Sequence, residues 1–315
     1  MVSTPQNPDP HISILMATFN GAAWLPEQLA SFQDQKHKNW QLIASDDGSK
    51  DGTQQLLTTF LTQNSGVYLE GPCNGCFANF LSLLKRAPTY MPAGGWFAFS
   101  DQDDVWLPER LSRGVAALNA LPDDKPALYC SRTWVVDNKL GDRRLSAPRR
   151  RRPGFRNALV QSIGGGNTIL VNAAAAKLLC DCAQEIDQFV SHDWWAYQVI
   201  SGVGGVILHD DTPSVLYRQH DHNVVGANLG PIAQMSRLIA LLKGQLRRWN
   251  TTNIHTLLTL ASRLTPENRK RLTLFVRAHA GHLTARISAT RRLGIYRQTR
   301  LGTACIFLSA VLNKL

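Results

Sequence analysis

Carboxylates occur in several clusters along this chain where they could do chemistry, and one cluster directly follows a short apolar segment. Residues 100–106 read Ser-Asp-Gln-Asp-Asp-Val-Trp, and three carboxylates this close repel one another unless a cation neutralises them. Carboxylates two residues apart, such as Asp101 and Asp103, suit Mg²⁺ or Mn²⁺ held jointly with phosphate oxygens. We therefore expect a divalent metal and a phosphate-bearing ligand at this segment.

A second acidic group lies earlier, in the segment 45–51, where Asp46 and Asp47 precede Gly48 and Ser49. Acids before a Gly-Ser turn favour a loop whose carboxylates face a ligand. The same residue types also form plain turns that lead into a capped helix. Both interpretations stay open from this segment alone.

Two later groups are individually weaker. A metal–diphosphate site would still need a third metal ligand and a cation near the leaving group. Residues 191–195 place the carboxylate of Asp193 between a polar and an aromatic stretch. Residues 217–220 read Tyr-Arg-Gln-His, so Arg218 could face a leaving group and His220 could be a third metal ligand. A lone Asp or His is more often structural than catalytic, so each group is weak by itself.

Alternating short apolar runs and helical patterns would position these residues. Strands are predicted at 12–17, 41–45, 67–69 and 96–100, and helices at 24–32, 52–61, 77–84 and 108–121. Further helices are predicted at 173–182 and 193–200, and strands at 206–208 and 215–217. This order predicts an α/β fold with a mostly parallel central sheet. Ligands of such sheets bind beyond the carboxyl ends of the strands, where the acidic groups fall.

Taken together, these motifs resemble family 2 nucleotide-sugar glycosyltransferases of the GT-A fold, in particular a rhamnosyltransferase-like branch. The resemblance covers about residues 11–227 in the family's order and spacing. The matching segments are 14–21, 46–51, 74–80, 100–106, 165–167, 192–195 and 217–220, with Asn223 and Gly226.

The resemblance implies roles for individual residues. Asp193 would be the general base, and Asp101, Asp103 and His220 would hold the metal. The donor would contact Thr18, Phe19, Asn20, Asp46, Asp47, Asn79, Asp101, Gln102, Asp104 and Arg218. The acceptor side would comprise Gly165, Gly166, Asn167, Trp194 and Trp195.

The resemblance also implies the reaction, in which a sugar moves from a nucleoside diphosphate to a hydroxyl with inversion at the anomeric carbon. The donor would be dTDP-rhamnose or a related dTDP- or UDP-sugar. The acceptor would be a cell-surface glycan or a lipid-linked saccharide. Mg²⁺ or Mn²⁺ would be the cofactor.

The net charge of +11 is unevenly distributed along the chain. Residues 231–315 hold 15 Lys and Arg but one acid, Glu267, whereas residues 1–230 are mildly acidic. We predict a disordered N-terminus at 1–10, the GT-A domain at 11–230, and a basic, mainly helical region at 231–315. The basic region suits an anionic membrane surface, the enzyme body or a homo-oligomer contact. With no secretory leader visible, we expect a cytoplasmic protein, peripheral on the inner face of the cytoplasmic membrane.

Other classes fit less well. A nucleic-acid binder is not expected, because the basic residues of the tail are spread among regularly spaced leucines rather than forming a known reader. Residues 245–249 match the Q-x-x-R-W motif of processive polysaccharide synthases, but the chain lacks their membrane spans and the same residues continue an amphipathic helical pattern over 235–249. A nucleotidyltransferase would need a glycine- and lysine-rich phosphate loop after the first strand.

Two further features have no assigned chemistry. The cysteine pairs Cys73–Cys76 and Cys180–Cys182 fit no standard zinc spacing, so free thiols are expected. Residues 142–156 carry seven arginines and predict an exposed loop, either solvated or in contact with an anionic acceptor.

Overall fold

The first strands are apolar on both faces, which explains a sheet covered by helices on both sides. In the computed structural model, which describes residues 9–220 and 244–315, β1 (Ile12–Thr18) is buried at every position. Successive side chains of a strand point to opposite faces, so Leu15 and Ala17 enter one core while Ile14 and Met16 enter another.

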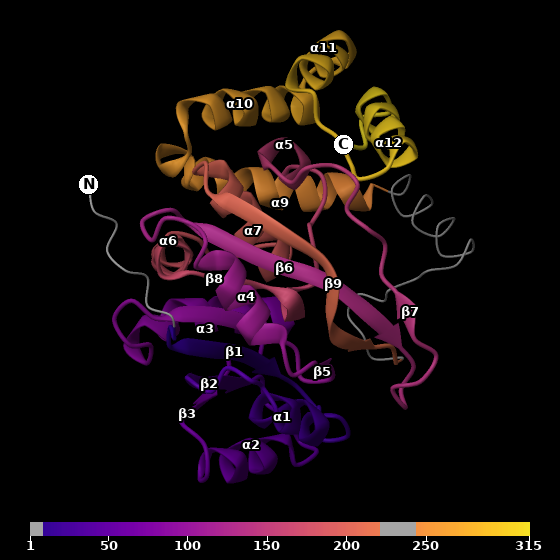
Figure 1. Ribbon diagram of the computed structural model, residues 1–315. Helices are drawn as coiled ribbons and strands as arrows, with labels where there is room; N and C mark the ends of the chain where they lie inside the picture. Colours follow the sequence, from indigo (N-terminus) through magenta and orange to yellow (C-terminus); the bar gives the residue numbers. More distant parts are fainter. Residues whose placement is uncertain (1–8, 221–243) are drawn as a thin grey trace.

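Nine strands form one curled sheet (Figure 1). The strands after β1 are β2 (Trp40–Asp46), β3 (Gly66–Glu70), β4 (Trp96–Ser100), β5 (Val105–Trp106), β6 (Ala127–Val136), β7 (Arg144–Leu145), β8 (Leu170–Val171) and β9 (Val206–Arg218). The order is β3-β2-β1-β4-β8-β6-β9-β5, with β7 paired to β6. The long pairings are parallel, whereas each antiparallel pairing joins only two residue pairs. The predicted mostly parallel α/β sheet is confirmed.

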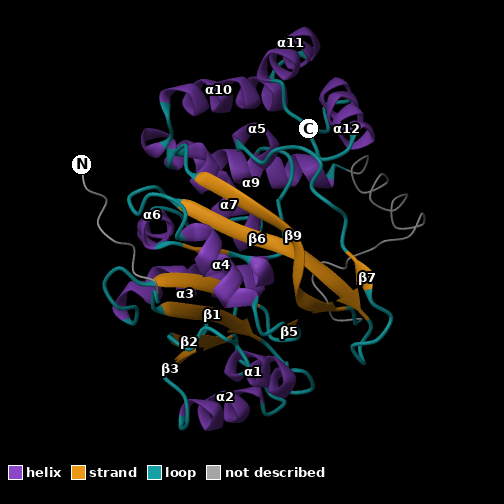
Figure 2. Cartoon of the chain, in the orientation of Figure 1, coloured by secondary structure: helices purple, strands orange, loops and turns teal. Residues whose placement is uncertain are grey.

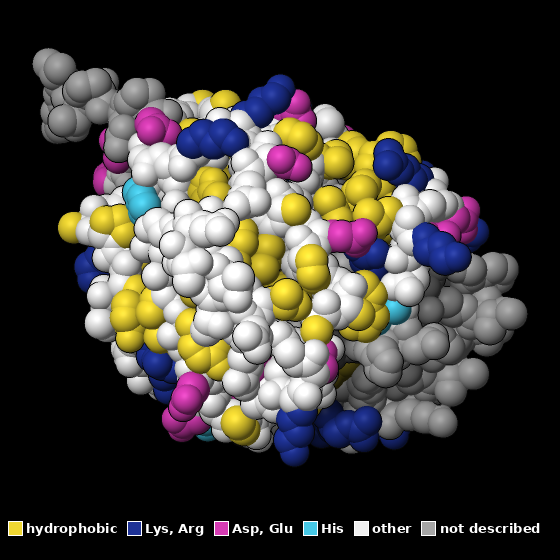
Figure 3. All heavy atoms as spheres, turned by 90° about the horizontal axis from the view of Figure 1, so that it is seen from below, with side chains coloured by type: hydrophobic (Ala, Val, Ile, Leu, Met, Phe, Trp, Pro, Cys, Tyr) yellow, Lys and Arg dark blue, Asp and Glu magenta, His cyan; other side chains and the backbone are white. Residues whose placement is uncertain are grey.

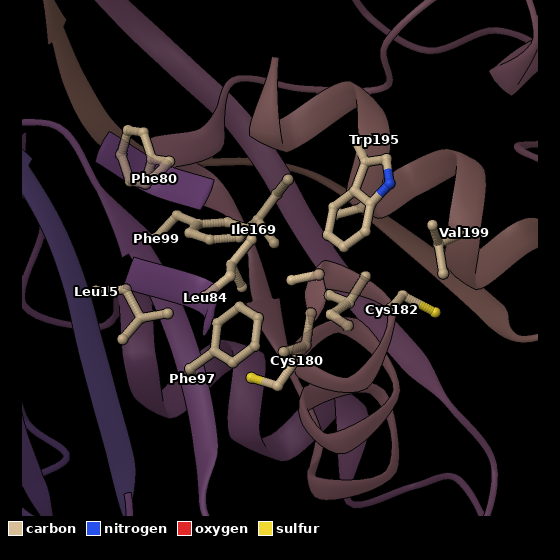
Figure 4. Close-up of a cluster of buried hydrophobic side chains, with 14 of the residues drawn as sticks. Leu15, Phe80, Leu84, Phe97, Phe99, Ile169, Cys180, Cys182, Trp195 and Val199 are labelled. Atoms are coloured by element: carbon tan, nitrogen blue, oxygen red, sulfur yellow. The ribbon is translucent and has the colours of Figure 1, made fainter. Parts of the chain in front are cut away.

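Helices cover both faces of this sheet (Figure 2). On one side lie α3 (Cys76–Arg86), α6 (Ala173–Gln184) and α7 (His192–Gly202), and on the other α1 (Leu25–Gln33), α2 (Thr53–Leu61) and α4 (Arg110–Leu118). Figure 4 shows the first core, in which Phe80 of α3 and Trp195 of α7 face Phe97 and Phe99 of β4.

Strand register brings the acidic segments to one edge. Thr18 is opposite Asp46 in the β1–β2 pairing, and Met16 is opposite Ser100 in the β1–β4 pairing. The chain therefore leaves β2 and β4 at the same end of the sheet on either side of β1, and residues 46–51 and 101–104 flank the loop that follows β1.

Two parts of the sheet differ from the sequence prediction. Residues 127–136 were not predicted as a strand, yet they form β6 beside the long strand β9. The runs predicted as separate strands at 206–208 and 215–217 are one strand, β9, with register shifts near Arg132 of β6. Polar residues in the middle of both strands interrupt their apolar pattern.

The arginine-rich segment is more than an exposed loop. It contains β7, and its end passes into the short helix α5 (Phe155–Ala158). Arg149 is half-buried, with its Nε donating to the carbonyl oxygen of Ile163 at 2.6 Å. The predicted full exposure is therefore wrong for this part of the segment.

The chain ends in the predicted helical region, which packs on the sheet domain through α5 and α7. Its helices are α9 (Gln245–Thr259), α10 (Pro266–Ala280), α11 (Leu283–Leu293) and α12 (Arg300–Val311). Three short 3₁₀ helices also occur, η1 (Ala87–Thr89), η2 (Gly166–Thr168) and η3 (Ala261–Arg263). Within the described residues, none of the helices combines the length and apolar character needed to cross a membrane.

Some predictions fall wholly or partly outside the described residues. These are most of the N-terminal segment 1–10, the boundary at 230, Asn223, Gly226 and the amphipathic pattern over 235–249 up to residue 243. Within α9, Leu246 is buried as that pattern predicts, while Trp249 is half-exposed.

Candidate functional site

The loop after β2 is built around Asp46. Its buried carboxylate accepts hydrogen bonds from the backbone of Ser49 at 2.8 Å, from the Ser49 hydroxyl at 2.6 Å and from Gln54 Nε2 at 2.9 Å. Thr18 Oγ1 also donates to Oδ2, the oxygen that accepts the Ser49 hydroxyl, at 2.8 Å. Asp46 and Thr18, both predicted to contact the donor, therefore shape the loop through these bonds.

Asp47 and Asn79 connect this loop to α3. The Asp47 carboxylate accepts the backbone N–H of Gly75 at 2.6 Å, just before α3 begins. Asn79 is buried and bonds twice to Ser45, accepting from its hydroxyl at 2.6 Å and donating to its carbonyl oxygen at 2.8 Å. Asn79 of α3 thus fixes the end of β2 through these two hydrogen bonds.

Phe19 is the exposed side chain at this edge, with 54% of its surface accessible. Gln102 fixes the backbone of Phe19, because its Oε1 accepts the Phe19 N–H at 2.8 Å and its Nε2 donates to the Phe19 carbonyl oxygen at 2.9 Å. Asn20 has a positive φ of 46° and accepts the Lys50 N–H at 2.9 Å. Phe19, Asn20 and Gln102, all predicted to contact the nucleotide-sugar donor, therefore lie together at this edge.

Asp101 and Asp103 follow β4, and their carboxylates are poorly compensated. Burial, together with the nearby carboxylates of Asp103 and Asp193, raises the pKa of Asp101 to about 8. Asp103 Oδ2 lies 2.8 Å from His220 Nε2, and the His220 ring stacks on Trp24 with centroids 4.0 Å apart. The structure thus brings together Asp101, Asp103 and His220 from separate parts of the sequence.

Asp104 points into the protein. It is fully buried, accepts a short hydrogen bond from Asn167 Nδ2, and accepts the Arg218 backbone N–H at 3.1 Å. Burial and the neighbouring Asp103 and Asp101 carboxylates raise its pKa well above the ordinary range. The predicted contact between Asp104 and a donor sugar does not agree with this burial.

Arg218 is also buried, and its guanidinium binds the protein. Nε donates to the Asp103 carbonyl oxygen at 2.8 Å, Nη1 to the Asn138 carbonyl oxygen at 2.5 Å, and Nη2 pairs with Glu27. This arrangement fixes the backbone of the acidic loop. The predicted contact between Arg218 and the donor stays a prediction beside this role.

Arg110 of α4 is a buried cation that sequence reasoning missed. Its Nε donates to the Asn167 carbonyl oxygen at 3.0 Å, and Nη2 donates to Phe99 at 3.4 Å and Ile169 at 3.2 Å. The guanidinium lies 3.4 Å from the centre of the Trp106 ring. Arg110 therefore ties the end of β4 to η2. Its charge also faces Asp104, while burial lowers the pKa of Arg110 to about 9.

Asp193 lies in the first turn of α7, and its Oδ2 accepts the Ser162 hydroxyl at 3.0 Å. Its neighbour His192 is buried between Phe80 and Phe99, with ring centroids 3.7 Å and 4.7 Å away. Burial lowers the pKa of His192 to about 4, so the imidazole is neutral near pH 7. Asp193 is thus the partly exposed acid of this turn.

The Gly165–Gly166 pair lies against this turn. A Cβ added to Gly166 would stand 1.9 Å from His192 Nε2, so only glycine fits there. Gly165 is exposed, with an extended backbone at φ −74°, and an added Cβ would meet only the Asn167 side chain. Gly165 is the predicted acceptor-side residue that faces solvent.

Both predicted acceptor-side tryptophans are buried. Trp194 Nε1 donates to the Ala158 carbonyl oxygen at 2.6 Å, and Trp195 packs against Phe189 with centroids 5.5 Å apart. The aromatic pair therefore anchors α7 through this packing, and its predicted place on the acceptor side stays a prediction.

The thiol of Cys76, the first residue of α3, lies near several of these carboxylates. Burial raises the pKa of its thiol, and the carboxylates of Asp101, Asp103, Asp47 and Asp193 raise it further. Acids from the ends of β2 and β4 and the start of α7 thus surround one partly buried thiol. All six cysteines are free, as predicted.

The donor atoms of Asp101, Asp103 and His220 determine whether a metal ion fits this site. In the described residues, no three His, Cys, Asp or Glu side chains group closely enough to hold an ion by themselves. Asp101 lies near the carboxylates of Asp103 and Asp193, and burial with their charge raises its pKa. Carboxylate oxygens beside an imidazole are ligands that Mg²⁺ or Mn²⁺ accepts. These residues fit a cation whose remaining ligands come from a bound diphosphate.

Residues 13–176 match the sequence profile of glycosyl transferase family 2. The chain belongs to this family. It is 28% identical over 253 residues to the dTDP-rhamnosyl transferase RfbG of Shigella flexneri, which covers 76% of this chain and 83% of that protein. A shorter match, 32% identical over 114 residues, is to the putative glycosyltransferase EpsE of Bacillus subtilis, and covers 36% of this chain and 40% of EpsE.

Solved structures identify the fold. TarS 1–349 of S. aureus in complex with UDP has a TM-score of 0.55 at 14% identity, covering 96% of this chain and 88% of that one. The same protein with UDP-GlcNAc has a TM-score of 0.52, covering 91% and 93%. The predicted GT-A fold of this glycosyltransferase is confirmed.

Proposed function

We propose that this glycosyltransferase moves rhamnose from dTDP-rhamnose to a hydroxyl of a cell-surface glycan or lipid-linked saccharide. The observation that carries the proposal is the similarity to RfbG, a dTDP-rhamnosyl transferase, over most of both chains. A related dTDP- or UDP-sugar is the alternative donor. The unsatisfied acidic group after β4 supports a nucleoside diphosphate donor in either case.

Asp193 is proposed as the general base. Ser162 occupies its Oδ2, and within the described residues nothing donates to Oδ1, which leaves that oxygen to take the proton of the acceptor hydroxyl. A hydroxyl is a weak nucleophile, so removal of its proton during attack lowers the barrier. Attack on the anomeric carbon from the side opposite the diphosphate would invert its configuration in one displacement.

Asp101, Asp103 and His220 are proposed to hold Mg²⁺ or Mn²⁺. When bound, the ion supplies positive charge to the diphosphate, which gains negative charge as it leaves. Trp24 and Arg218 keep the protein side of this site in place, the first by stacking on His220 and the second by fixing the Asp103 backbone.

Phe19 is proposed to stack on the nucleobase, because its ring is exposed while Gln102 fixes its backbone. Asn20 and Asp47 would line the same end of the site, with Asp46, Thr18 and Asn79 supporting them. Gly165, Gly166 and Asn167 would border the acceptor, and Asn167 also orients Asp104.

We further propose that the protein works in the cytoplasm, peripheral on the inner face of the cytoplasmic membrane. A lipid-linked acceptor would lie there. The basic composition of residues 231–315 supports this location.

A panel of nucleotide sugars tests the donor. We expect dTDP-rhamnose with Mg²⁺ or Mn²⁺ to raise the melting temperature and to be hydrolysed slowly without acceptor, and we expect a chelator to reduce both effects. A UDP-sugar that stabilised the protein more than dTDP-rhamnose would change the donor. If no donor stabilised it with metal present, the proposed function would be wrong.

A further inference from the structure

The last helix, α12, leaves an apolar face uncovered. Leu301, Leu308 and Leu312 are 74%, 49% and 46% exposed, and their spacing of seven and four residues places them on one side of the helix. The opposite side carries Ile306 and Ala310, which are buried in the core of the C-terminal region. A helix that is apolar on both sides is normally covered on both, so this outer face is a contact surface.

Basic side chains surround this face from two distant parts of the sequence. Arg151 exchanges backbone hydrogen bonds with the Gln298 side chain at 2.9 and 3.1 Å, and its guanidinium lies 4.1 Å from the centre of the Tyr296 ring. The arginine-rich segment 149–156 is thereby held beside the start of α12, next to Arg300.

Helix α11 adds more positive charge. It packs beside α12 (Figure 1), where Arg286 Nε donates to the Ala310 carbonyl oxygen at 2.7 Å, and it carries the exposed Arg291 and Arg292. The sole acid in residues 244–315 is Glu267, which pairs with Arg271 on α10. The end of the molecule with α1 and α2, seen in Figure 3, instead shows acidic and basic side chains intermixed.

We infer that the α12 surface, formed by Leu301, Leu308 and Leu312 with the arginines beside them, docks on an anionic lipid bilayer. An interfacial helix buries leucines among the acyl chains while basic residues meet anionic headgroups. A second copy of the chain is a poor occupant, because it would bring two arginine clusters together with no acids between them. Nucleic acid would match the charge and leave the leucines exposed.

The inference deepens the peripheral location proposed above by naming the surface and the lipid class, and it rests on that part of the proposed function. The docking segment is also joined to the proposed base. Residues 149–163 run from the arginine cluster to Ser162, whose hydroxyl bonds to Asp193. A docked enzyme would therefore hold the acceptor side of its site close to the segment that touches the bilayer.

Vesicle co-sedimentation of the full chain tests this surface without any sugar transfer. We expect binding to vesicles of phosphatidylglycerol and phosphatidylcholine, weakening as salt rises, and no binding to phosphatidylcholine alone. Replacing all three leucines (Leu301→Ala, Leu308→Ala, Leu312→Ala) should weaken the partition about tenfold or more. The double variant Arg291→Gln with Arg292→Gln should weaken it about tenfold at low salt.

Leu258→Ala is the matched control, because Leu258 is 50% exposed near the far end of α9 from α12. It should bind vesicles like the unmodified chain. The leucine variant should keep its donor-induced thermal shift, which separates a failed docking surface from a failed donor site. Equal binding by the leucine variant and the unmodified chain would overturn the inference. So would a dimer in sedimentation velocity that the leucine changes dissociate, because a second copy would then cover the face.

Discussion

The loops after β2 and β4 flank the loop after β1 at one edge of the sheet, and both begin with aspartates, yet their carboxylates have opposite surroundings. Asp46 after β2 accepts hydrogen bonds from backbone, hydroxyl and amide donors of its own loop. Asp101 after β4 lies among other carboxylates, and burial with their charge raises its pKa to about 8. One loop uses its acid to fold, whereas the other crowds carboxylates together, so that the charged form of Asp101 is disfavoured.

The difference separates supporting acids from acids available to a ligand. A carboxylate with many donors stabilises its loop and has no free capacity, whereas crowded carboxylates destabilise the fold until a cation binds. By the same criterion Asp104, held by Asn167 and Arg218, belongs with Asp46. Asp193, with one hydroxyl partner, belongs with Asp101.

The largest effect is expected from Asp193→Asn, which changes an acid that we assign to ligand chemistry and not to loop support. The amide cannot take a proton, so we expect turnover to fall about a thousandfold while donor binding persists. Steady-state transfer and donor-induced thermal shift measure the two quantities. Asp187→Asn, an exposed acid just before α7, is the control and should retain turnover. Near-normal turnover of the Asp193 variant would remove this residue from the mechanism.

Removing an acid from each of the two loops should change the free energy of unfolding in opposite directions. Asp46→Ala leaves the buried Thr18 hydroxyl and the partly buried donors of Ser49 and Gln54 without an acceptor, and should lower the free energy of unfolding by about 3 kcal/mol. Asp101→Ala relieves repulsion and should raise it by about 1 kcal/mol when a chelator is present, while abolishing transfer. Urea unfolding of both variants measures the difference. Equal destabilisation by the two changes would contradict the comparison.

Arg110 tests whether the acidic loop needs its buried cation. Arg110→Met removes the donors to Phe99, Asn167 and Ile169 and the charge facing Asp104, so we expect a loss of about 3 kcal/mol of stability. Arg110→Lys should recover part of it. Arg113→Met, on the same helix, breaks only a partly exposed pair with Asp210 and should cost less than about 1 kcal/mol. Similar losses for Arg110→Met and Arg113→Met would show that the buried position is unimportant.

The smallest effect is expected from His192, in the turn that carries Asp193, and concerns the pH dependence of stability. Its pKa of about 4 in the folded chain lies below the ordinary value of 6.5, so the unfolded chain takes up the proton first. Stability is therefore complete above the ordinary value and is lost as the pH falls towards the folded one. One such group costs about 2 kcal/mol between about pH 7 and about pH 5.

His192→Leu should remove that part of the pH dependence, as measured by urea unfolding at the two pH values. His209, whose pKa burial also lowers to about 4, will maintain a remaining slope in this variant. The exposed His255→Leu is the control and should leave the dependence as in the unmodified chain. An unchanged slope in His192→Leu would mean that this imidazole is not buried in the neutral form.

The fold was predictable wherever burial made the pattern continuous. β1 and β4 are buried on both faces, so each appears as an unbroken apolar run. β6 was not predicted and β9 was predicted as two strands, because Ser131 and Arg132, and Asp210 and Asp211, interrupt their patterns. Partners distant in sequence satisfy these residues: Arg132 donates to the Ser146 carbonyl oxygen, and Asp210 pairs with Arg113.

The site was predictable in its residue types and less so in its contacts. The spacing of acids after β2 and β4 indicated a ligand edge, and the structure places them there. The sequence could not show which carboxylates already have partners, because those partners are distant. Arg110 meets the Asn167 carbonyl oxygen 57 residues away, and Arg218 meets Glu27 across 191 residues.

The two adjacent glycines of η2 differ in a way that matters for engineering. Gly166 lies so close to His192 that no substitution can be accommodated without moving the turn of Asp193. Gly165 faces solvent with a backbone conformation open to any residue. A library that seeks new acceptor preference should therefore vary position 165 and leave position 166 unchanged. Side chains introduced there would extend into solvent beside the turn of Asp193 once the Asn167 side chain, 2.8 Å from an added Cβ, has shifted.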